Sequence, residues 1–382
     1  MLFGAERGNL EALCSLKSQG ATLLCLIRDE SWSTIVPAAL DARGIAWRKV
    51  PYVEQWRPSR AHVVIFRSAW AFVVANWRFL AAVRDFRPTH VHAYGQLFVL
   101  NFLAGMMLVR TPLVFRAGDE PTLHNKFWRM TWRYVVNRTS MFVANSRFVG
   151  RSLIDSGVPV QRVTLIYNAP PSRPRRDGEV FYAPPAGRLV AYVGQIAEHK
   201  GPHLLVEAFK GLASEFPDIH LVVAGRISEW QGDAWARALR DRTLSDPELI
   251  NRVSFIGQVE DIPGVLAASA FAVVPSVFND PSPNVVTETK QAGRAVIGFP
   301  RGGIPELIEH DVDGLVCSQV SVIALQIAMH RYLADPSLVE KHGAAALRSL
   351  DRLGVPEFGR RWRAVYEIGS SSDSRPAPMG AR

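Results

Sequence analysis

The chain has 382 residues, of which 48% are hydrophobic and 21% charged, so it is globular in composition and long enough for two domains. No segment reaches the ~18 uninterrupted apolar residues of a membrane-spanning helix, and the start MLFGAERGNL lacks the pattern of a secretory signal. We therefore expect a cytoplasmic protein. The three cysteines lie far apart without a histidine partner, which indicates neither a disulfide framework nor a zinc site.

The net charge of +9 is unevenly distributed. Residues 1–187 hold 24 basic against 12 acidic side chains and residues 188–382 hold 20 against 23, which gives +12 and −3. Seven of the ten tryptophans also fall in residues 1–187. This composition fits contact with an anionic membrane surface, and possible peripheral binding to its inner face. Nucleic acid is disfavoured because no nucleic-acid motif accompanies the charge, while a solvated basic face over core tryptophans stays an open alternative.

Helix and strand patterns alternate along the first half. Strands are expected at 21–27, 45–50, 89–93 and 113–115. Helices are expected at 9–19, 33–43 and 97–108, and a further long amphipathic helix is expected to include Val83 and Phe86. Such βα units predict a parallel sheet covered by helices. A doubly wound domain opens with a strand that feeds a glycine-bearing loop. Here Gly4–Gly8 reads as that loop with no strand ahead, so we expect the first strand to be missing.

The second half repeats the scheme. Strands are expected at 189–194, 219–225, 252–257, 271–276 and 295–299. The two halves are joined by the proline-rich, basic segment 171–187, which is typical of a linker. The tail 369–382 is low in apolar residues and is expected to be disordered.

The loop in VGQIAEHKG is a candidate phosphate site. A strand ends at Gly194, and Gln195, Lys200 and Gly201 precede a helix. Free amides and the helix dipole add to a lysine charge at such a place, which suits an anionic phosphate. By itself the loop also fits a surface turn.

The stretch NDPSPNVVTET places two carboxylates around a helix start. Ser282 is expected as the N-cap and Pro283 as the first helical residue, with Asn284 following. Asp280 then lies just ahead of the cap and Glu288 about a turn and a half inside the helix. Both carboxylates suit the hydroxyl groups of a sugar or ribose. A turn aspartate and a solvated glutamate are the alternative.

A third loop, PRGGIPE, follows the strand at 295–299. Gly302 and Gly303 allow backbone amides to approach a ligand, and Glu306 is expected in the first turn of a helix at 304–308. Because the carboxyl ends of parallel strands share one edge of a sheet, the three loops are expected to border one crevice.

Taken together, these motifs resemble a known family. The succession VGQIAEHKG, VVAG, FIGQVED, VPSVFNDPSPNVVTETKQAG and GFPRGGIPELIEHDVDGLV resembles the nucleotide-sugar domain of the retaining family 4 glycosyltransferases of group 1. The resemblance is close over about 188–335. It is looser over the first half, through VHAYG, VFRAGDE, VANSRFVGRSL and VTLIYNAP, and 356–368 resembles the family's crossover helix.

The resemblance implies the GT-B fold, with two doubly wound Rossmann-like domains facing each other across a cleft. Residues 1–170 would form the acceptor side and 188–355 the donor domain. It implies a hexosyltransferase that uses a nucleoside diphosphate sugar as co-substrate, a glycan or lipid-linked acceptor, and no tightly bound metal or other cofactor.

The resemblance also implies roles for single residues. Lys200 would hold the donor diphosphate, Glu288 would accept the ribose hydroxyls, and Asp280 would lie near the sugar hydroxyls. The expected substrate-binding residues are Gly194, Gln195, Gly201, Asn284, Gly302, Gly303 and Glu306, with Arg116 and Asp119 on the acceptor side.

Three positions depart from the family pattern. Asp280 is one methylene shorter than the usual glutamate, Gln195 stands where arginine is common, and the acceptor-side histidine is missing, since His124 lies at the wrong place. These departures leave two alternatives: a nucleotide-sugar epimerase or isomerase on the same fold, or a nucleotide-sugar-binding protein with impaired catalysis. A nicotinamide dehydrogenase is disfavoured because no G-x-G-x-x-G follows a strand.

Overall fold

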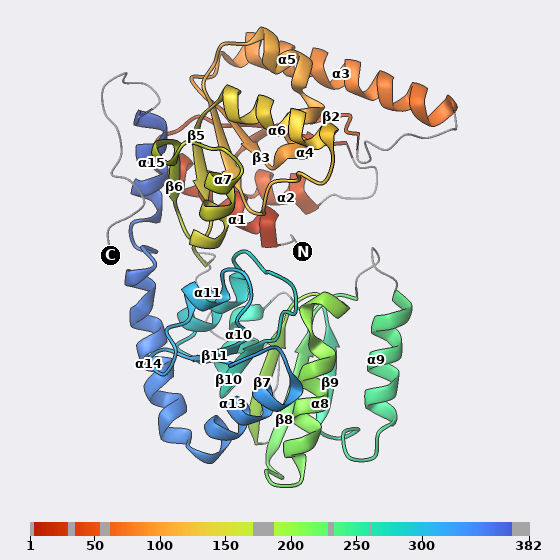
Figure 1. The fold of residues 1–382 in the computed structure, drawn as a ribbon, viewed down its shortest axis with the longest axis vertical. Coiled ribbons are helices and arrows are strands. Elements are labelled where there is room, and N and C mark those ends of the chain that lie inside the picture. Colours follow the sequence, from red (N-terminus) through yellow and green to blue (C-terminus); the bar gives the residue numbers. More distant parts are fainter. Residues whose placement is uncertain are drawn as a thin grey trace. The chain divides into compact units, whose positions relative to one another are not determined.

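The computed structural model describes residues 4–29, 35–53, 62–170, 187–227, 233–259 and 261–368. The chain divides into two compact units, residues 2–166 with 357–382 and residues 167–356 (Figure 1). Each unit is an α/β structure with parallel strands, which confirms the predicted fold class of two Rossmann-like domains. Most of the predicted linker and the whole predicted tail lie outside the described residues.

The unit of residues 2–166 and 357–382 contains two separate parallel sheets. Strands β1 (Leu24–Arg28) and β2 (Ala46–Val50) pair with each other, and a second sheet has the order β3 (Val91–Tyr94), β4 (Leu113–Ala117), β5 (Thr139–Ala144) and β6 (Val163–Leu165). The helices are α1 (Gly4–Ser18), α2 (Ile35–Asp41), α3 (His62–Phe86), α4 (Gln96–Asn101), α5 (Leu103–Leu108), α6 (Lys126–Arg138), α7 (Arg147–Asp155) and α15 (Phe358–Ile368). All five residues of β4 are buried, as expected for a strand covered on both faces.

The unit of residues 167–356 contains one six-stranded parallel sheet. Its strands are β7 (Arg188–Val193), β8 (Ile219–Ala224), β9 (Val253–Gly257), β10 (Phe271–Val274), β11 (Ala295–Gly298) and β12 (Leu315–Val316), in the order β12-β11-β10-β7-β8-β9. The helices are α8 (Pro202–Ala213), α9 (Asp233–Ser245), α10 (Ile262–Ala268), α11 (Asn284–Gln291), α12 (Ile304–Leu307), α13 (Val322–Ala334) and α14 (Pro336–Arg352).

The strand order of this sheet reverses between β7 and β10. From β7 the chain adds β8 and β9 on one side, and then returns to add β10, β11 and β12 on the other side. Helices that leave neighbouring strands in opposite directions open a crevice at the carboxyl ends of those strands, which is where ligands bind in open parallel sheets. The loops that follow β7 and β10 therefore meet at the point where a ligand site is expected.

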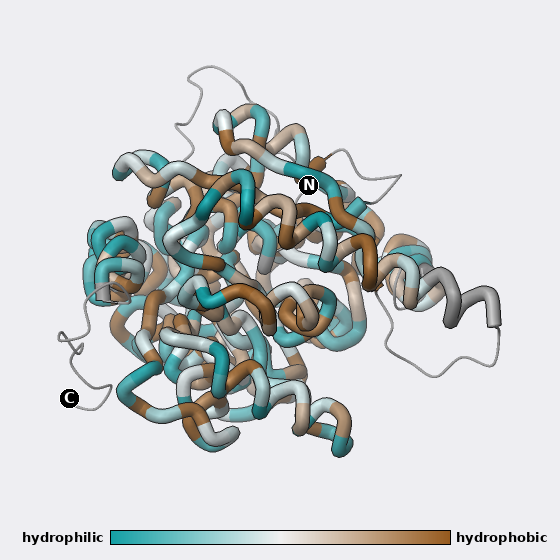
Figure 2. Tube along the Cα trace, turned by 90° about the horizontal axis from the view of Figure 1, so that it is seen from above, coloured by the Kyte–Doolittle hydropathy of each residue, from teal (hydrophilic) through white to brown (hydrophobic). Residues whose placement is uncertain are grey.

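A continuous apolar core supports this sheet. Phe209 of α8, Phe271 of β10 and Tyr332 of α13 are fully buried within it, together with the inward residues of the central strands. Burying such an aromatic side chain stabilises a fold by about 1.5–3 kcal/mol. Figure 2 shows that hydrophobic and hydrophilic segments alternate along the chain trace.

Three local predictions were wrong. Residues 4–8 belong to helix α1 and are not a loop, and the helix predicted at 97–108 is interrupted at Phe102, which separates α4 from α5. Helix α11 is capped by Pro283 instead of Ser282, and no side chain caps it. The missing first strand stays a prediction: the described residues begin at Gly4, and in them no strand joins β1 to β3.

Candidate active site

Lys200 and Asp280 form an ion pair where the strand order reverses. Lys200 ends a 3₁₀ turn (Glu198–Lys200) in the loop after β7, and Asp280 lies in the loop after β10. The Lys200 Nζ lies 2.6 Å from the Asp280 Oδ2, which also accepts a hydrogen bond of 3.2 Å from the Ser276 hydroxyl. The Asp280 side chain is 8% exposed and that of Lys200 is 25% exposed, so the lysine is the more accessible partner.

Further contacts hold the two loops together. The Lys200 ammonium lies 4.7 Å from the centre of the Phe278 ring, and the His199 ring packs edge-on against the same ring. The His199 carbonyl accepts a hydrogen bond of 3.0 Å from the Val277 amide. A cation fixed over an aromatic face keeps its charge in a defined position, so the loop presents a positioned ammonium group.

Two glycines allow the loops to come this close. Gly201 has φ +73°, and a Cβ there would lie 1.9 Å from the Pro275 carbonyl oxygen. Gly302 has φ +55°, and a Cβ there would lie 2.2 Å from the Asp280 carbonyl oxygen. The same carbonyl accepts a hydrogen bond of 2.8 Å from the Gly303 amide. Three of the predicted loops therefore meet at Asp280, as their position at one sheet edge predicts.

Glu288 lies on α11, and only 6% of its surface is exposed. Asn284 begins that helix, and its side-chain oxygen accepts a hydrogen bond of 2.8 Å from the Asn168 amide group. Asn168 was not among the predicted site residues, although it belongs to the motif VTLIYNAP. The neighbouring Tyr167 donates a hydrogen bond of 3.1 Å to the Glu306 carboxylate, which fixes the predicted residue of α12.

Gln195 sits at the other end of the same loop. Its carbonyl oxygen accepts a hydrogen bond of 2.6 Å from the Tyr192 hydroxyl. Burial of the ring, and to a smaller extent the negative charge of Asp280, raises the pKa of Tyr192 far above its usual range, so the phenol stays protonated. Gly194 precedes Gln195 at the end of β7. The residue after Gly194 thus contributes a backbone carbonyl to the folding of the loop.

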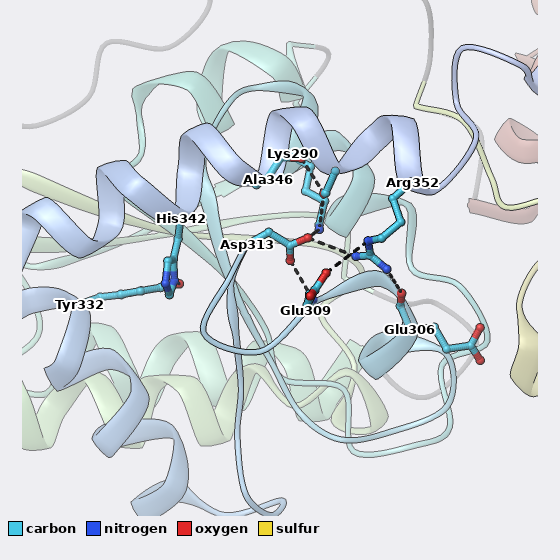
Figure 3. Close-up of polar contacts among 9 residues, drawn as sticks. Lys290, Glu306, Glu309, Asp313, Tyr332, His342, Ala346 and Arg352 are labelled. Carbon is cyan, nitrogen blue, oxygen red and sulfur yellow. Dashed lines mark hydrogen bonds and ion pairs between the residues drawn. The ribbon is translucent and has the colours of Figure 1, made fainter. Parts of the chain in front are cut away.

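A second buried ion pair lies behind α11. Lys290, two residues after Glu288, is fully buried with its Nζ 2.6 Å from the Asp313 Oδ2 (Figure 3). The Asp313 carboxylate also contacts the Arg352 guanidinium at 3.2 Å and accepts a hydrogen bond of 2.8 Å from the Glu309 amide. Burial lowers the pKa of Lys290 to about 8, although the Asp313 charge opposes the shift. This carboxylate therefore fastens the helix that carries Glu288 to the segment that follows α12.

A pocket of about 400 Å³, which was not predicted, lies beside this site. It opens at the carboxyl ends of β7, β8 and β9 and is lined by Ile196, Gly225, Arg226, Ile227, Arg237, Arg240, Phe255, Gly257 and Gln258. Since Ile196 follows Gln195, one loop borders both the pocket and the Lys200–Asp280 pair. The Gly-Arg step at the end of β8 was the available signal, because a glycine at a strand end often allows close approach.

Arg116 and Asp119 lie in the other unit, at the end of β4. Arg116 is buried, donates a hydrogen bond of 2.9 Å to the Asn9 side chain and lies 5.6 Å from the centre of the Tyr94 ring. Burial lowers its pKa from the usual value. Asp119 is exposed. The pKa of Tyr94 is raised to about 12, mainly because Tyr94 is buried and secondly by the negative charge of Asp119. The two residues thus gather around Tyr94.

Two family models match the chain. The model of the glycosyl transferases group 1 matches residues 180–348, and the model of the glycosyl transferase 4-like domain matches residues 3–169. The chain belongs to the family 4, group 1 glycosyltransferases. This confirms the resemblance inferred from the motifs.

Named glycosyltransferases are among its relatives. The chain is 26% identical over 271 residues to the putative glycosyltransferase YtcC of Bacillus subtilis, covering 64% of this chain and 66% of that protein. It is 27% identical over 279 residues to the lipopolysaccharide core biosynthesis mannosyltransferase LpcC of Rhizobium leguminosarum, covering 73% and 77%.

The fold has solved counterparts as well. The Anabaena protein Alr3699/HepE, solved in complex with UDP-glucose, aligns with a TM-score of 0.75 at 18% identity and covers 97% of each chain. This likeness confirms the two-domain GT-B architecture. In the described part of this glycosyltransferase, no helix combines the length and apolar character needed to cross a bilayer.

Proposed function

We propose that this family 4 glycosyltransferase moves a hexosyl group from a nucleoside diphosphate sugar to an acceptor hydroxyl, with retention of the anomeric configuration, in the assembly of a glycan or glycolipid. The observation that carries the proposal is the Lys200–Asp280 pair at the reversal of the strand order, next to an arginine-lined pocket. Positive charge at this edge suits a diphosphate leaving group, whose developing charge must be stabilised in the transition state.

The donor is assigned to three neighbouring parts of this edge. The nucleotide base would occupy the pocket lined by Arg226 and Phe255, and Lys200 would bind the diphosphate. Glu288 would accept the ribose hydroxyls. The amides of Gly302 and Gly303 would lie near the donor sugar, close to Asp280. No bound metal is required by this proposal, because the lysine and the loop amides supply the positive charge.

Asp280 has a defined part in this scheme. Without donor, its carboxylate neutralises Lys200 at 2.6 Å. A diphosphate carries more negative charge than a carboxylate and would displace it from the ammonium group. The released carboxylate could then accept hydrogen bonds from the sugar hydroxyls. The ion pair would therefore hold Lys200 in place until the donor arrives.

The acceptor and the location are assigned from the other unit. Arg116 and Asp119 would bind a glycan or lipid-linked acceptor, and the protein would act in the cytoplasm at the inner face of a membrane. The basic surplus of residues 1–187 supports contact with anionic lipids.

Turnover of the donor tests this assignment. Lys200→Ala and Glu288→Ala are expected to lower turnover by about 10²–10³-fold, the usual effect of losing one positioned electrostatic contact. Lys210→Ala is the matched control, because Lys210 also pairs with an aspartate at 2.6 Å, on the outer surface of α8. Full activity of the Lys200 variant, or an equal loss in the Lys210 variant, would exclude the proposed role of Lys200.

Product analysis separates the competing activities. An epimerase or isomerase converts the donor without an acceptor, whereas a transferase needs one, and a binding protein does neither. The named relatives are transferases and do not favour the first alternative. The anomeric configuration of the product, read by NMR, tests retention.

A further inference from the structure

Helix α3 presents apolar side chains on its outer face. Trp70, Val73 and Trp77 recur at helical spacing and are 64%, 59% and 66% exposed. The opposite face of the same helix packs inward, and Phe79 there is 4% exposed. A single exposed apolar residue is ordinary, but a row of three that includes two tryptophans leaves a large apolar area uncovered.

The neighbouring helices α5 and α6 also expose apolar side chains. Helix α5 packs against α3, where a Cβ at Gly105 would lie 2.6 Å from the Phe79 ring. Its end exposes Met107 and Leu108 by 68% and 74%, and α6 exposes Met130 by 64%. Arg138 at the end of α6 donates hydrogen bonds to the Met106 and Val109 carbonyls, so the end of α5 contacts α6 as well as α3.

The charged side chains in and beside these helices are mostly basic. The one acidic residue within α3, α5 and α6 is Asp85, which pairs with Arg48 and Arg84. The exposed cations there include Arg78, Arg110, Lys126, Arg129 and Arg133. In the part of the chain that the structure describes, none of these five forms an ion pair. These helices therefore combine exposed apolar groups with cations that have no acidic partner among the described residues.

We propose that the exposed residues of α3, α5 and α6 form the surface by which the protein binds an anionic phospholipid membrane. Tryptophan rings favour the boundary between headgroups and acyl chains, and long basic side chains reach headgroup phosphates from there. We call this surface the lipid-binding face. Its residues would make the membrane contact proposed above for the basic first half of the chain. It rests on charge and exposure, and it holds whether or not the protein transfers a sugar.

The choice of lipid over nucleic acid or protein follows from the mixture of groups. Nucleic acid needs cations along a backbone but no row of exposed aliphatic residues, such as Met107 and Leu108. A protein interface is depleted of charge at its centre, whereas on α6 the exposed Arg133 lies three residues after the exposed Met130 and so shares its helix face. An anionic lipid surface satisfies both sets of groups at once.

Sedimentation with vesicles tests the proposal. The intact protein is incubated with vesicles of phosphatidylcholine alone and of phosphatidylcholine with phosphatidylglycerol, at low and raised salt. We expect binding to the anionic vesicles that weakens with salt. Each basic residue near an anionic surface contributes about a factor of five, so Arg129→Gln/Arg133→Gln should bind roughly thirty-fold more weakly. Trp70→Ala/Trp77→Ala should also bind more weakly, because it loses the inserted rings.

Two matched variants control for loss of charge and of apolar area elsewhere. Lys341→Gln/Arg348→Gln removes two exposed cations from α14. Ile323→Ala/Ile327→Ala removes two apolar side chains from α13, where Ile323 is 67% exposed and Ile327 is 65% exposed. Both should bind anionic vesicles like the unmodified protein.

Five results would overturn the proposal. Four of them are no binding to anionic vesicles, equal binding to neutral ones, equal losses in the control variants, and sedimentation without vesicles, which would indicate self-association. Tighter binding to a single-stranded oligonucleotide than to anionic vesicles would assign the face to nucleic acid instead. Thermal stabilisation by donor sugars is measured on the same variants. If donor sugars do not stabilise the protein while vesicle binding is unchanged, the result counts against the proposed function and not against the lipid-binding face.

Discussion

Replacing Lys290 by methionine should weaken the unit that holds the donor site. The change keeps the unbranched apolar stem of the side chain but leaves the Asp313 carboxylate, which is 1% exposed, without its partner at 2.6 Å. Removing one member of a buried pair costs about 3–5 kcal/mol. Arg352 remains 3.2 Å from the carboxylate and keeps part of its charge compensated. We therefore expect a loss near the lower limit, about 3 kcal/mol.

The assay must report on one unit of a two-unit chain, because such chains need not unfold in a single step. Hydrogen exchange of the slowest amides in β10 and β11 gives the opening free energy of the sheet that α11 covers. Lys210→Met is the matched control: its pair has the same distance of 2.6 Å but is 37% and 22% exposed, and its loss should be several-fold smaller. Equal losses in the two variants, or no loss for Lys290→Met, would refute the reasoning. The double variant Lys290→Met/Asp313→Leu should recover most of the stability, since no unpaired charge remains.

Three further predictions follow from the site. The pKa of Lys290 is about 8 in the folded protein against a usual 10.5, so the unfolded chain binds more protons than the folded one between these pH values. The free energy of unfolding of the unmodified protein, relative to that of Lys290→Met, should therefore rise with pH in this range by at most about 3 kcal/mol. A difference that does not change with pH in hydrogen-exchange titrations would contradict the lowered pKa. Gly302→Ala should lower kcat/KM for the donor by about a hundred-fold, because its Cβ meets the Asp280 carbonyl; Gly293→Ala, also at positive φ (+66°) but with open space, should lower it much less. Asp280→Asn should tighten binding of a free nucleoside diphosphate in calorimetry, because Lys200 loses a competing carboxylate, while sugar transfer falls; weaker binding would contradict the proposed exchange.

The fold and the centre of the site could be predicted from local sequence. Buried parallel strands are continuous apolar runs such as LVAYV and FAVV, and their ends locate the loops that carry ligand groups. This is why Lys200, Asp280 and Gly302 could be expected at one edge, and the structure places them in contact. Capping chemistry was less decisive: serine is the common N-cap, yet Pro283 occupies that position in α11.

Features that depend on distant contacts were not predictable. Lys290 reads as a solvated helix position until the fold brings Asp313 beside it. The pocket combines residues from three strand ends with two arginines of α9, Arg237 and Arg240, whose spacing alone indicates a surface helix. The Arg116 guanidinium is buried against Tyr94 and Asn9, which lie far from it in the sequence. In each case tertiary burial, which has no local signature, decides the role.

A thermal-shift titration would measure whether Lys200 holds the diphosphate of a nucleotide sugar. Uridine, guanosine and adenosine diphosphate sugars are each titrated against the intact protein and against Lys200→Ala and Lys210→Ala. A bound donor at a hundred times its Kd stabilises the folded state by about 2.7 kcal/mol. We expect at least one donor to raise the Tm of the unmodified protein and of Lys210→Ala but not of Lys200→Ala. A donor that stabilises Lys200→Ala equally well would contradict the proposed role of Lys200.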